Sequence, residues 1–211
     1  MAERPLAERR GPGGQGLAIG ILAMATVVAV SNLLVQFPLG DLLTLGAFTY
    51  PLAFLVTDLS NRLMGPAAAR RVVLAGFAVG VVLSIVLAGP RIALASGTAF
   101  LVAQLIDVAV FDRLRSGSWW RAPAVSTLVG SALDTVLFFS LAFAAAFDGV
   151  FAALGGEAAW AQTPVPLLYV GPDVPLWVNL AAGDFLVKLA MAGLALVPYR
   201  AVVGAAAASR G

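Results

Sequence analysis

The sequence predicts an all-α membrane protein with six transmembrane helices and both termini in the cytoplasm. Three observations support this prediction. The 211 residues are 61% apolar and only 11% charged, with a mean hydropathy of +0.96, whereas soluble domains carry roughly 25% charged residues. Six apolar runs approach the length of about 20 residues that crosses a bilayer as a helix. Positive residues gather in alternate loops between these runs.

We expect the six helices at residues 17–37, 42–59, 72–89, 92–111, 123–147 and 177–197. Residues 1–16 are rich in Gly, Arg and Glu and should form a disordered cytoplasmic tail. Residues 17–200 then form a single transmembrane domain, and residues 201–211 a second cytoplasmic tail. The longest predicted loop, residues 148–175, lies on the opposite side of the membrane, as a plain loop or as a partial lid in the interface.

The arginines set the expected orientation. One side of the predicted topology holds eleven of them, and the other side holds Arg91 alone. Because cytoplasmic loops are enriched in Lys and Arg, this distribution places both termini in the cytoplasm and requires an even number of spans. The pI near 9.5 therefore follows from topology, and we do not expect nucleic-acid binding. The eleven are Arg4, Arg9, Arg10, Arg62, Arg70, Arg71, Arg113, Arg115, Arg121, Arg200 and Arg210.

The chain contains no Cys and no His. This composition excludes disulfides, thiol nucleophiles, imidazole proton relays and the usual zinc sites, so we expect no metal and no cofactor. The sequence also lacks a Walker A pattern, which excludes nucleotide hydrolysis by that route. Carboxylates must carry most of the ionisable chemistry, and we expect no enzymatic activity.

Ionisable side chains inside the predicted spans are the best guide to function. A charge at the centre of a spanning helix costs on the order of 3 kcal/mol, so such residues usually face a bundle interior and mark a pathway. Two of them are expected near the cytoplasmic side and two near mid-membrane, while the fifth lies one turn from the lysine, in the order of an intrahelical ion pair. In that order they are Asp58, Asp107, Asp134, Lys188 and Asp184.

Two interpretations of these residues remain open. In the first, Asp184 or Asp134 neutralises Lys188, and the other acids lie at half-exposed helix ends. In the second, the carboxylates and Gln104 converge on a polar cavity that binds a ligand or a proton. Aromatic side chains on the same helical stripes then provide either stacking surface for a flat ligand or ordinary core packing. These aromatic residues are Phe54, Phe111 and Phe138.

The predicted third span contains a row of small residues at spacings of four. Gly76, Gly80 and Ser84 lie on one face of this helix. Such rows allow helices to approach closely. The row serves either packing within the bundle or the seam of a homodimer.

Three stretches of the chain carry a family resemblance. The first runs Thr49-Tyr50-Pro51-Leu52, Thr57-Asp58-Leu59, Asn61-Arg62, Gly65 and Ala69-Arg70-Arg71. The second runs Gln104-Leu105-Ile106-Asp107-Val108, Phe111, Arg113-Leu114-Arg115, Trp119-Trp120, Ala122-Pro123, Ser126-Thr127, Asp134-Thr135 and Phe138. The third is Lys188 with Pro198 ten residues later. Together they resemble the queuosine precursor transporter family, also called the vitamin uptake transporter family, over roughly residues 45–200.

The resemblance implies six membrane helices in the inner membrane of a bacterial cell. It also implies import of queuosine precursors, notably 7-cyano-7-deazaguanine and 7-aminomethyl-7-deazaguanine. A guanine-like edge offers adjacent N–H donors to a carboxylate, and an aromatic wall suits the flat ring. The ligand or proton site implied by the resemblance comprises Asp58, Gln104, Asp107 and Asp134, with Lys188 as a counter-charge and Asn61, Thr127 and Arg121 as supports.

The mode of action has alternatives. Many family members have an acid where this chain has Arg62, so no role is built on that acid here. The carboxylates favour a gradient-driven secondary carrier, although facilitated diffusion would show the same motifs. A substrate-binding subunit of a multi-component vitamin-type transporter is a second possibility. An intramembrane lipid-modifying enzyme is a third, but its clustered Asp-Gly-x-x-Ala-Arg block is lacking, since Ala69-Arg70 follows Asp58 across a loop.

Overall fold

The computed structural model describes residues 12–40, 42–154 and 158–209. Within these residues, five helices are long and apolar enough to cross a membrane. They are α1 (Pro12–Leu34), α4 (Pro66–Ala88), α5 (Pro90–Leu114), α6 (Arg121–Phe143) and α8 (Leu176–Ala208). These helices confirm the prediction of an all-α, multi-pass membrane protein.

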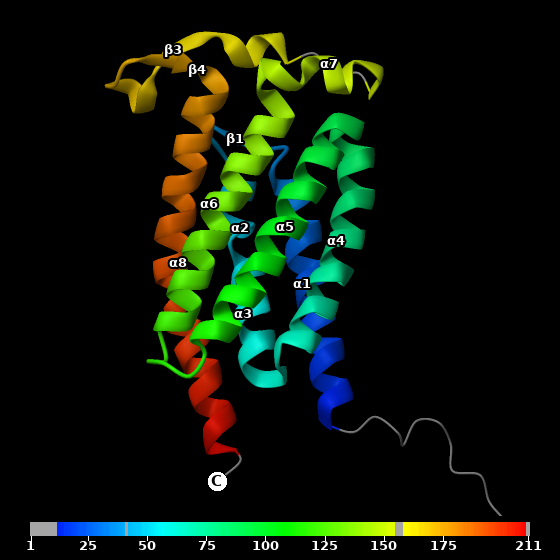
Figure 1. Cartoon of the computed structure of the whole chain (residues 1–211), viewed down its shortest axis with the longest axis vertical. Helices are drawn as coiled ribbons and strands as arrows, with labels where there is room; N and C mark the ends of the chain where they lie inside the picture. The colour runs from blue at the N-terminus through cyan, green and yellow to red at the C-terminus, as the bar shows by residue number, and fades with distance from the viewer. Residues whose placement is uncertain (1–11, 41, 155–157, 210–211) are drawn as a thin grey trace, which may run out of the picture.

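The long helices lie side by side along the longest axis of the molecule (Figure 1). The start of α1, the end of α8 and the turns before α4 and α6 all lie at one end of the bundle. We call this end the basic end, because Arg62, Arg115 and Arg121 lie at or beside these turns. Residues 144–154 and 158–175 cover the opposite end, which we call the loop end.

Two Gly-Pro pairs make the sharp reversals on either side of α4. Gly65 and Gly89 both have a φ of +87°, a region that suits glycine because it has no Cβ. Pro66 and Pro90 follow as the first helical residues, where the missing N–H of proline costs nothing. The chain therefore turns back at each pair with almost no loop.

The predicted span at residues 42–59 differs from expectation. It begins with a small hairpin of β1 (Pro38–Leu39) and β2 (Leu43–Thr44) and continues as two helices, α2 (Gly46–Thr49) and α3 (Leu52–Met64). Pro51 separates them because its ring and its missing N–H interrupt the helical ladder. The backbone nevertheless stays helical, with φ and ψ of −53° and −42° at Tyr50 and of −60° and −20° at Pro51.

The predicted tails differ partly from the structure. Residues 1–11 of the expected disordered tail lie outside the described residues, and α1 already begins at Pro12. At the other end of the chain, α8 continues to Ala208, well into the expected tail at residues 201–211. We expected a tail here because these residues follow the last apolar run. Residues 205–208 are all Ala, the strongest helix former, which favours continuation of the helix.

Short elements pack over the loop end between α6 and α8. Val165 and Val174 lie opposite each other in an antiparallel pair of strands. Gln162 Nε2 donates to the backbone oxygen of Phe143 at 2.6 Å, and Asn179 Oδ1 accepts from the amide of Leu168 at 2.7 Å, so the segment is tied to both long helices. The elements are η2 (Ala145–Phe147), α7 (Asp148–Phe151), η3 (Ala152–Leu154), η4 (Ala159–Gln162), β3 (Pro164–Pro166), η5 (Leu167–Tyr169) and β4 (Asp173–Pro175).

Glycines on α4 allow close helix packing inside the bundle. A Cβ at Gly76 would lie 2.5 Å from Met24 Cγ, and one at Gly80 would lie 3.2 Å from Val28 Cγ1. Both contacts are with α1, so the row of small residues packs within the bundle. This row therefore does not provide the seam of a homodimer.

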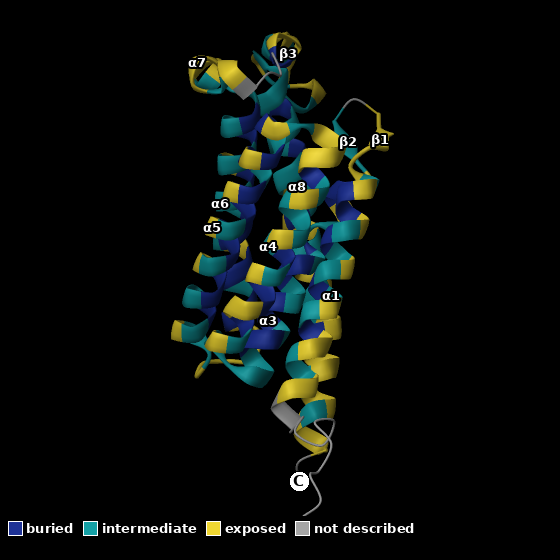
Figure 2. Ribbon diagram, turned by 90° about the vertical axis from the view of Figure 1, so that its right-hand side faces the viewer, coloured by how far each residue is buried: buried dark blue, intermediate teal, exposed yellow. Residues whose placement is uncertain are grey.

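The outer surface of the bundle is apolar. Exposed residues line the outer faces of the long helices, while the buried residues lie between the helices (Figure 2). Val86, Val136 and Val197 are among the most exposed large apolar residues, at 76%, 63% and 72%. In water such a surface would be costly, so the outer faces of these helices are suited to lipid.

Candidate functional site

An ion cluster at mid-height joins α6 to α8. Lys188 Nζ donates to Asp184 Oδ2 at 2.5 Å, to Asp134 Oδ2 at 2.7 Å and to Thr135 Oγ1 at 3.0 Å. The Thr135 hydroxyl in turn donates to Asp184 Oδ2 at 2.8 Å. Lys188 and Asp184 are one turn apart on α8, and Asp134 and Thr135 are neighbours on α6. The three protons of the buried ammonium group therefore all have acceptors.

The two carboxylates of the ion cluster keep one oxygen each for another partner. Among the described residues, no donor bonds to Asp134 Oδ1 or Asp184 Oδ1. The Asp134 and Asp184 side chains are 19% and 16% exposed, whereas Lys188 is 4% exposed. The cluster therefore presents acceptors outward and keeps its cation covered.

A cavity of about 490 Å³ lies above the ion cluster, toward the loop end. Asp134, Asp184 and Lys188 line it at mid-height, and the β1–β2 hairpin and Trp160 line it near the loop end. The volume falls within the range of about 300–1,000 Å³ that is typical of small-molecule sites. The cavity is therefore large enough for a compact ligand and has a charged floor.

Aromatic side chains form one wall of the cavity. The rings of Phe138 and Phe139 meet edge to face with their centroids 5.0 Å apart. The rings of Phe143 and Trp160 do the same at 5.5 Å. All four residues line the cavity, together with Phe100. A flat ligand would find stacking surface here.

Asn32 and Tyr50 line the cavity from α1 and from the α2–α3 junction. Asn32 Nδ2 donates to Tyr50 Oη at 3.0 Å and to the backbone oxygen of Val28 at 2.9 Å. The Tyr50 hydroxyl accepts one bond and so keeps its proton for another acceptor. Neither residue was among the expected site residues. The sequence signal that could have identified Asn32 was its amide side chain within the predicted span at residues 17–37.

A second polar group, which we call the acid layer, lies nearer the basic end. Ser126 Oγ donates to Asp58 Oδ1, and Thr127 Oγ1 donates to Asp58 Oδ2, both at 3.1 Å. Asp107 from α5 interacts with Asp58 and is fully buried. None of these four residues lines the cavity described above.

Two hydrogen bonds between α3 and α5 enclose the acid layer. On the cavity side, Thr57 Oγ1 donates to Gln104 Oε1 at 2.5 Å. On the basic side, Asn61 Nδ2 donates to the backbone oxygen of Val108 at 3.0 Å. Asp58 thus lies between residues 57 and 61 of α3, and Asp107 between residues 104 and 108 of α5, so both acids lie between these two bonds.

Arg62 and Phe111 lie at the basic end. The Arg62 side chain donates to Tyr199 Oη at 2.8 Å and to the backbone oxygen of Arg115 at 2.7 Å. Its guanidinium carbon lies 5.2 Å from the centroid of the Phe111 ring. Arg62 therefore connects α3 to α5 and α8. We expected many family members to carry an acid at this position.

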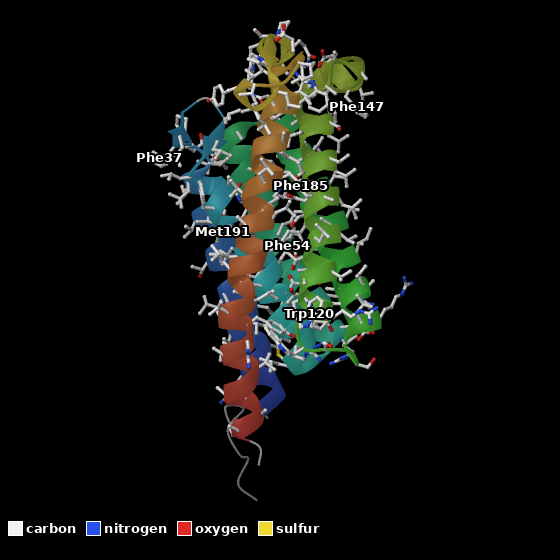
Figure 3. The ribbon with its side chains drawn as sticks, turned by 90° about the vertical axis from the view of Figure 1, so that its left-hand side faces the viewer. Phe37, Phe54, Trp120, Phe147, Phe185 and Met191 are labelled. Carbon is white, nitrogen blue, oxygen red and sulfur yellow. The ribbon has the colours of Figure 1, made fainter. Side chains whose placement is uncertain are left out.

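The three aromatic residues expected at the site are at different heights. Phe138 lines the cavity. Phe54 lies inside the bundle at mid-height, while Trp120 marks the basic end and Phe147 the loop end (Figure 3). Phe54 packs against Gly130, where an added Cβ would be 2.5 Å from its Cε1 atom. Phe111 packs edge to face with Tyr199 at 6.4 Å, in the part of the bundle that contains Arg62.

The structure therefore divides the expected site into two groups. Asp134, Lys188 and Phe138 line the cavity, together with Asp184, which was not part of the site implied by the resemblance. Arg121, expected as a support, is exposed at the start of α6. The remaining polar residues lie in the acid layer or form its enclosing bonds; they are Asp58, Asn61, Gln104, Asp107 and Thr127.

Comparisons with known proteins agree with one another. A family model described as "Putative vitamin uptake transporter" matches residues 44–89 and 84–203. The "Queuosine precursor transporter" of Escherichia coli (strain K12) is 40% identical over 141 residues, covering 56% of this chain and 64% of that protein. The chain thus spans slightly less than two thirds of this relative. No solved structure matches the chain.

Two further relatives carry the same description. The "Probable queuosine precursor transporter" of Haemophilus influenzae is 30% identical over 213 residues, covering 84% of this chain and 81% of that protein. Its namesake in Bacillus subtilis (strain 168) is 31% identical over 163 residues, covering 64% and 71%. The chain therefore belongs to the queuosine precursor transporter family, a family of membrane transporters rather than enzymes.

Proposed function

We propose that the protein is a secondary carrier that imports 7-cyano-7-deazaguanine and 7-aminomethyl-7-deazaguanine across the inner membrane of a bacterial cell. One observation carries the proposal. The cavity combines an aromatic wall with a floor of two carboxylates that each keep a free oxygen. A flat base with adjacent N–H donors matches this arrangement.

The chemistry of the base suggests how it is recognised. In a guanine-like base, the ring N–H and the exocyclic amine are neighbouring donors, which suit the free oxygens of Asp134 and Asp184. The carbonyl oxygen of the base accepts a hydrogen bond, and the Tyr50 hydroxyl can supply one. The ring stacks against Phe138 or Phe139. Lys188 balances the charge of the two carboxylates by holding its ammonium group against both of them.

The helical path through Pro51 supports a sixth membrane crossing. The backbone remains helical from Gly46 to Met64 through Pro51, so α2 and α3 together reach about 28 Å at 1.5 Å per residue. We propose that they form the sixth crossing. The basic end then faces the cytoplasm, because arginines gather there. The cavity lies in the opposite half and receives ligand from outside the cell.

The acid layer supports gradient-driven movement. Its two carboxyl groups lie in the cytoplasmic half of the proposed topology, beyond the cavity. They lie among α3, α5 and α6. Buried carboxyl groups without a structural cation are typical of ion pathways in carriers. We propose that Asp58, Asp107 and Gln104 belong to the second half of the transport route, with Asn61 and Thr127 as supports.

The experiment uses a host that lacks both synthesis of the deazaguanine ring and its own queuosine precursor transporter. Nanomolar precursor is supplied, and queuosine is measured in the host's tRNA. We expect the wild-type protein to restore queuosine and Asp134→Asn to lose most of it. Asp173→Asn, which makes the same change on an exposed strand of the loop end, is the matched control and should match the wild type.

Membrane levels of all three proteins must be measured in the same cells. Absence of queuosine with wild-type protein present in the membrane would contradict the proposed function. Uptake by the purified protein alone in liposomes tests the mode of transport. If uptake occurs only with added ATPase and scaffold subunits, the protein is a binding subunit and the carrier mechanism is wrong.

A further inference from the structure

The acid layer contains an acceptor group without a donor. Among the described residues, neither carboxyl oxygen of Asp107 has a hydrogen-bond donor, although the side chain is fully buried. Asp58, 2% exposed, already takes the hydroxyl protons of Ser126 and Thr127. A buried carboxylate without donors is among the most costly groups that a protein interior can hold. Asp107 therefore needs a partner that the side chains around it do not provide.

Among the described residues, no cation donates a hydrogen bond to the carboxyl groups of the acid layer. On α3, Arg62 Nε donates to Tyr199 Oη on α8 and Nη1 to the backbone oxygen of Arg115, while the buried Nη2 has no partner. Arg115 itself, on the turn after α5, pairs with Asp112 at 3.1 Å. The side chains that α6 presents to Asp58 are hydroxyls, and Lys188 of α8 is held in the ion cluster. The α1 helix carries no ionisable residue.

The remaining charges on α4 are at its basic end. Arg70 and Arg71 are both exposed, one to two turns from the start of that helix. They therefore face solvent or lipid headgroups rather than the acid layer. The two buried carboxyl groups thus have no cation bonded to them among the described residues, and two negative charges on neighbouring buried groups strongly disfavour each other.

A single proton resolves both problems. When one carboxyl group is protonated, its O–H donates to the other, so that Asp107 gains a partner and the pair carries one negative charge instead of two. We propose that Asp58 and Asp107 share one exchangeable proton and form the coupling site of the carrier, separate from the site that binds the base. This inference rests on the proposed import of deazaguanine bases.

The position of the acid layer fits a coupling site. Tyr50 at the α2–α3 junction lines the cavity, Phe54 on α3 follows one turn later and Asp58 one turn after that. The buried ring of Phe54, packed on Gly130, thus separates the base from the proton. In one transport cycle a proton adds to the pair from water on the outer side and leaves to water at the basic end. No other bond forms or breaks.

The test uses the full-length protein in liposomes with the membrane potential clamped to zero. Wild type, Asp107→Asn and Asp58→Asn are compared in two assays with labelled 7-cyano-7-deazaguanine. The first assay measures exchange of labelled for unlabelled base at equal pH on both sides. The second measures accumulation driven by a pH difference of one unit. A pH dye inside the liposomes records proton entry.

We expect the wild type to accumulate the base up to about tenfold, since one pH unit corresponds to a factor of ten at one proton per base. Both variants should retain exchange but lose accumulation and proton entry. Asp112→Asn, which makes the same substitution near the end of α5 outside the acid layer, should behave as the wild type. Asp58→Asn decides the question if Asp107→Asn does not fold.

Several results would overturn the proposal. Accumulation at the wild-type level in both variants would place the proton elsewhere while leaving base transport intact. Loss of exchange and of base binding in a folded variant would assign Asp58 and Asp107 to the base. Accumulation driven by a sodium gradient instead of a pH gradient would make the coupling ion sodium. If the wild type neither binds nor exchanges the base, the proposed function itself fails, and this inference fails with it.

Discussion

The contact between Phe54 and Gly130 gives a quantitative prediction about the layer between the cavity and the acid layer. Replacing Gly130 with Ala adds one methyl group on α6. Its carbon would lie 2.5 Å from Phe54 Cε1 and 3.2 Å from Cζ, distances at which one side must move. Phe54 is buried, with an exposure of 4%, so its ring has little room to shift. We therefore expect Gly130→Ala to destabilise the bundle.

The size of the effect follows from comparison with a neutral site. Overpacking by one methylene group typically costs about 1–3 kcal/mol. Alanine in place of glycine inside a helix also contributes about 0.5–1 kcal/mol of stabilisation. Gly193 on α8 offers the matched control, because nothing lies within 4 Å of a Cβ added there. Since the helical contribution is common to both, the two variants should differ by about 1–3 kcal/mol.

Thermal unfolding of the purified protein in detergent measures this difference. For a protein of this size, each kcal/mol shifts Tm by about 2–4 °C, so Gly130→Ala should unfold several degrees below Gly193→Ala. Adding Phe54→Leu to Gly130→Ala should recover part of the loss, because the leucine side chain lacks the ring carbons that clash. Equal Tm values for the two alanine variants would refute this account of the packing.

Other predictions concern the cavity. Lys188→Met removes the cation between two carboxylates and should cost up to about 3–5 kcal/mol in thermal unfolding. Combining it with Asp134→Asn and Asp184→Asn should restore Tm but not uptake; uptake by this triple variant would contradict a binding role for the cluster. Asn32→Leu should weaken binding of the base in a titration at unchanged Tm. Trp160→Ala removes a ring contact of about 0.5–1.5 kcal/mol and should raise KM with kcat unchanged.

The sequence predicted the membrane class and most helices because apolar length and arginine placement report directly on the bilayer. It did not predict the break at Pro51. Hydropathy is averaged over a window of residues. The residues on both sides of Pro51 are apolar, so the average shows one continuous apolar run and hides the break. The hairpin strands Pro38–Leu39 and Leu43–Thr44 were also missed, because two residues are too few to show the alternating pattern of a strand.

The candidate site was predicted in part. Asp134 and Lys188 were expected at the same depth, and in the structure they are in contact. The separation of Asp58 and Asp107 from the cavity could not be predicted. The position of a residue along a helix gives its depth in the membrane, but it does not show that the Phe54 ring lies between the cavity and these two acids. Asp184 was expected as an intrahelical partner of Lys188 and was not placed in the site, although one carboxyl oxygen can bind the lysine while the other faces a ligand.

Protection of a cysteine in the cavity shows directly whether the base binds there. The natural chain has no Cys, so a single cysteine gives an unambiguous signal. Ser96→Cys is a conservative change in the lining, and Val170→Cys, at 92% exposure on the loop end, is the control. A membrane-impermeant maleimide is added to the loop-end side, with and without 7-cyano-7-deazaguanine.

If the base binds in the cavity, both cysteines react from this side and the base protects the cysteine at position 96 alone. A chemically similar nucleobase without the amine and ring N–H donors should protect neither position. If the base fails to protect the cavity cysteine at concentrations that saturate uptake, the base binds elsewhere, and the cavity above the ion cluster is not the transport site.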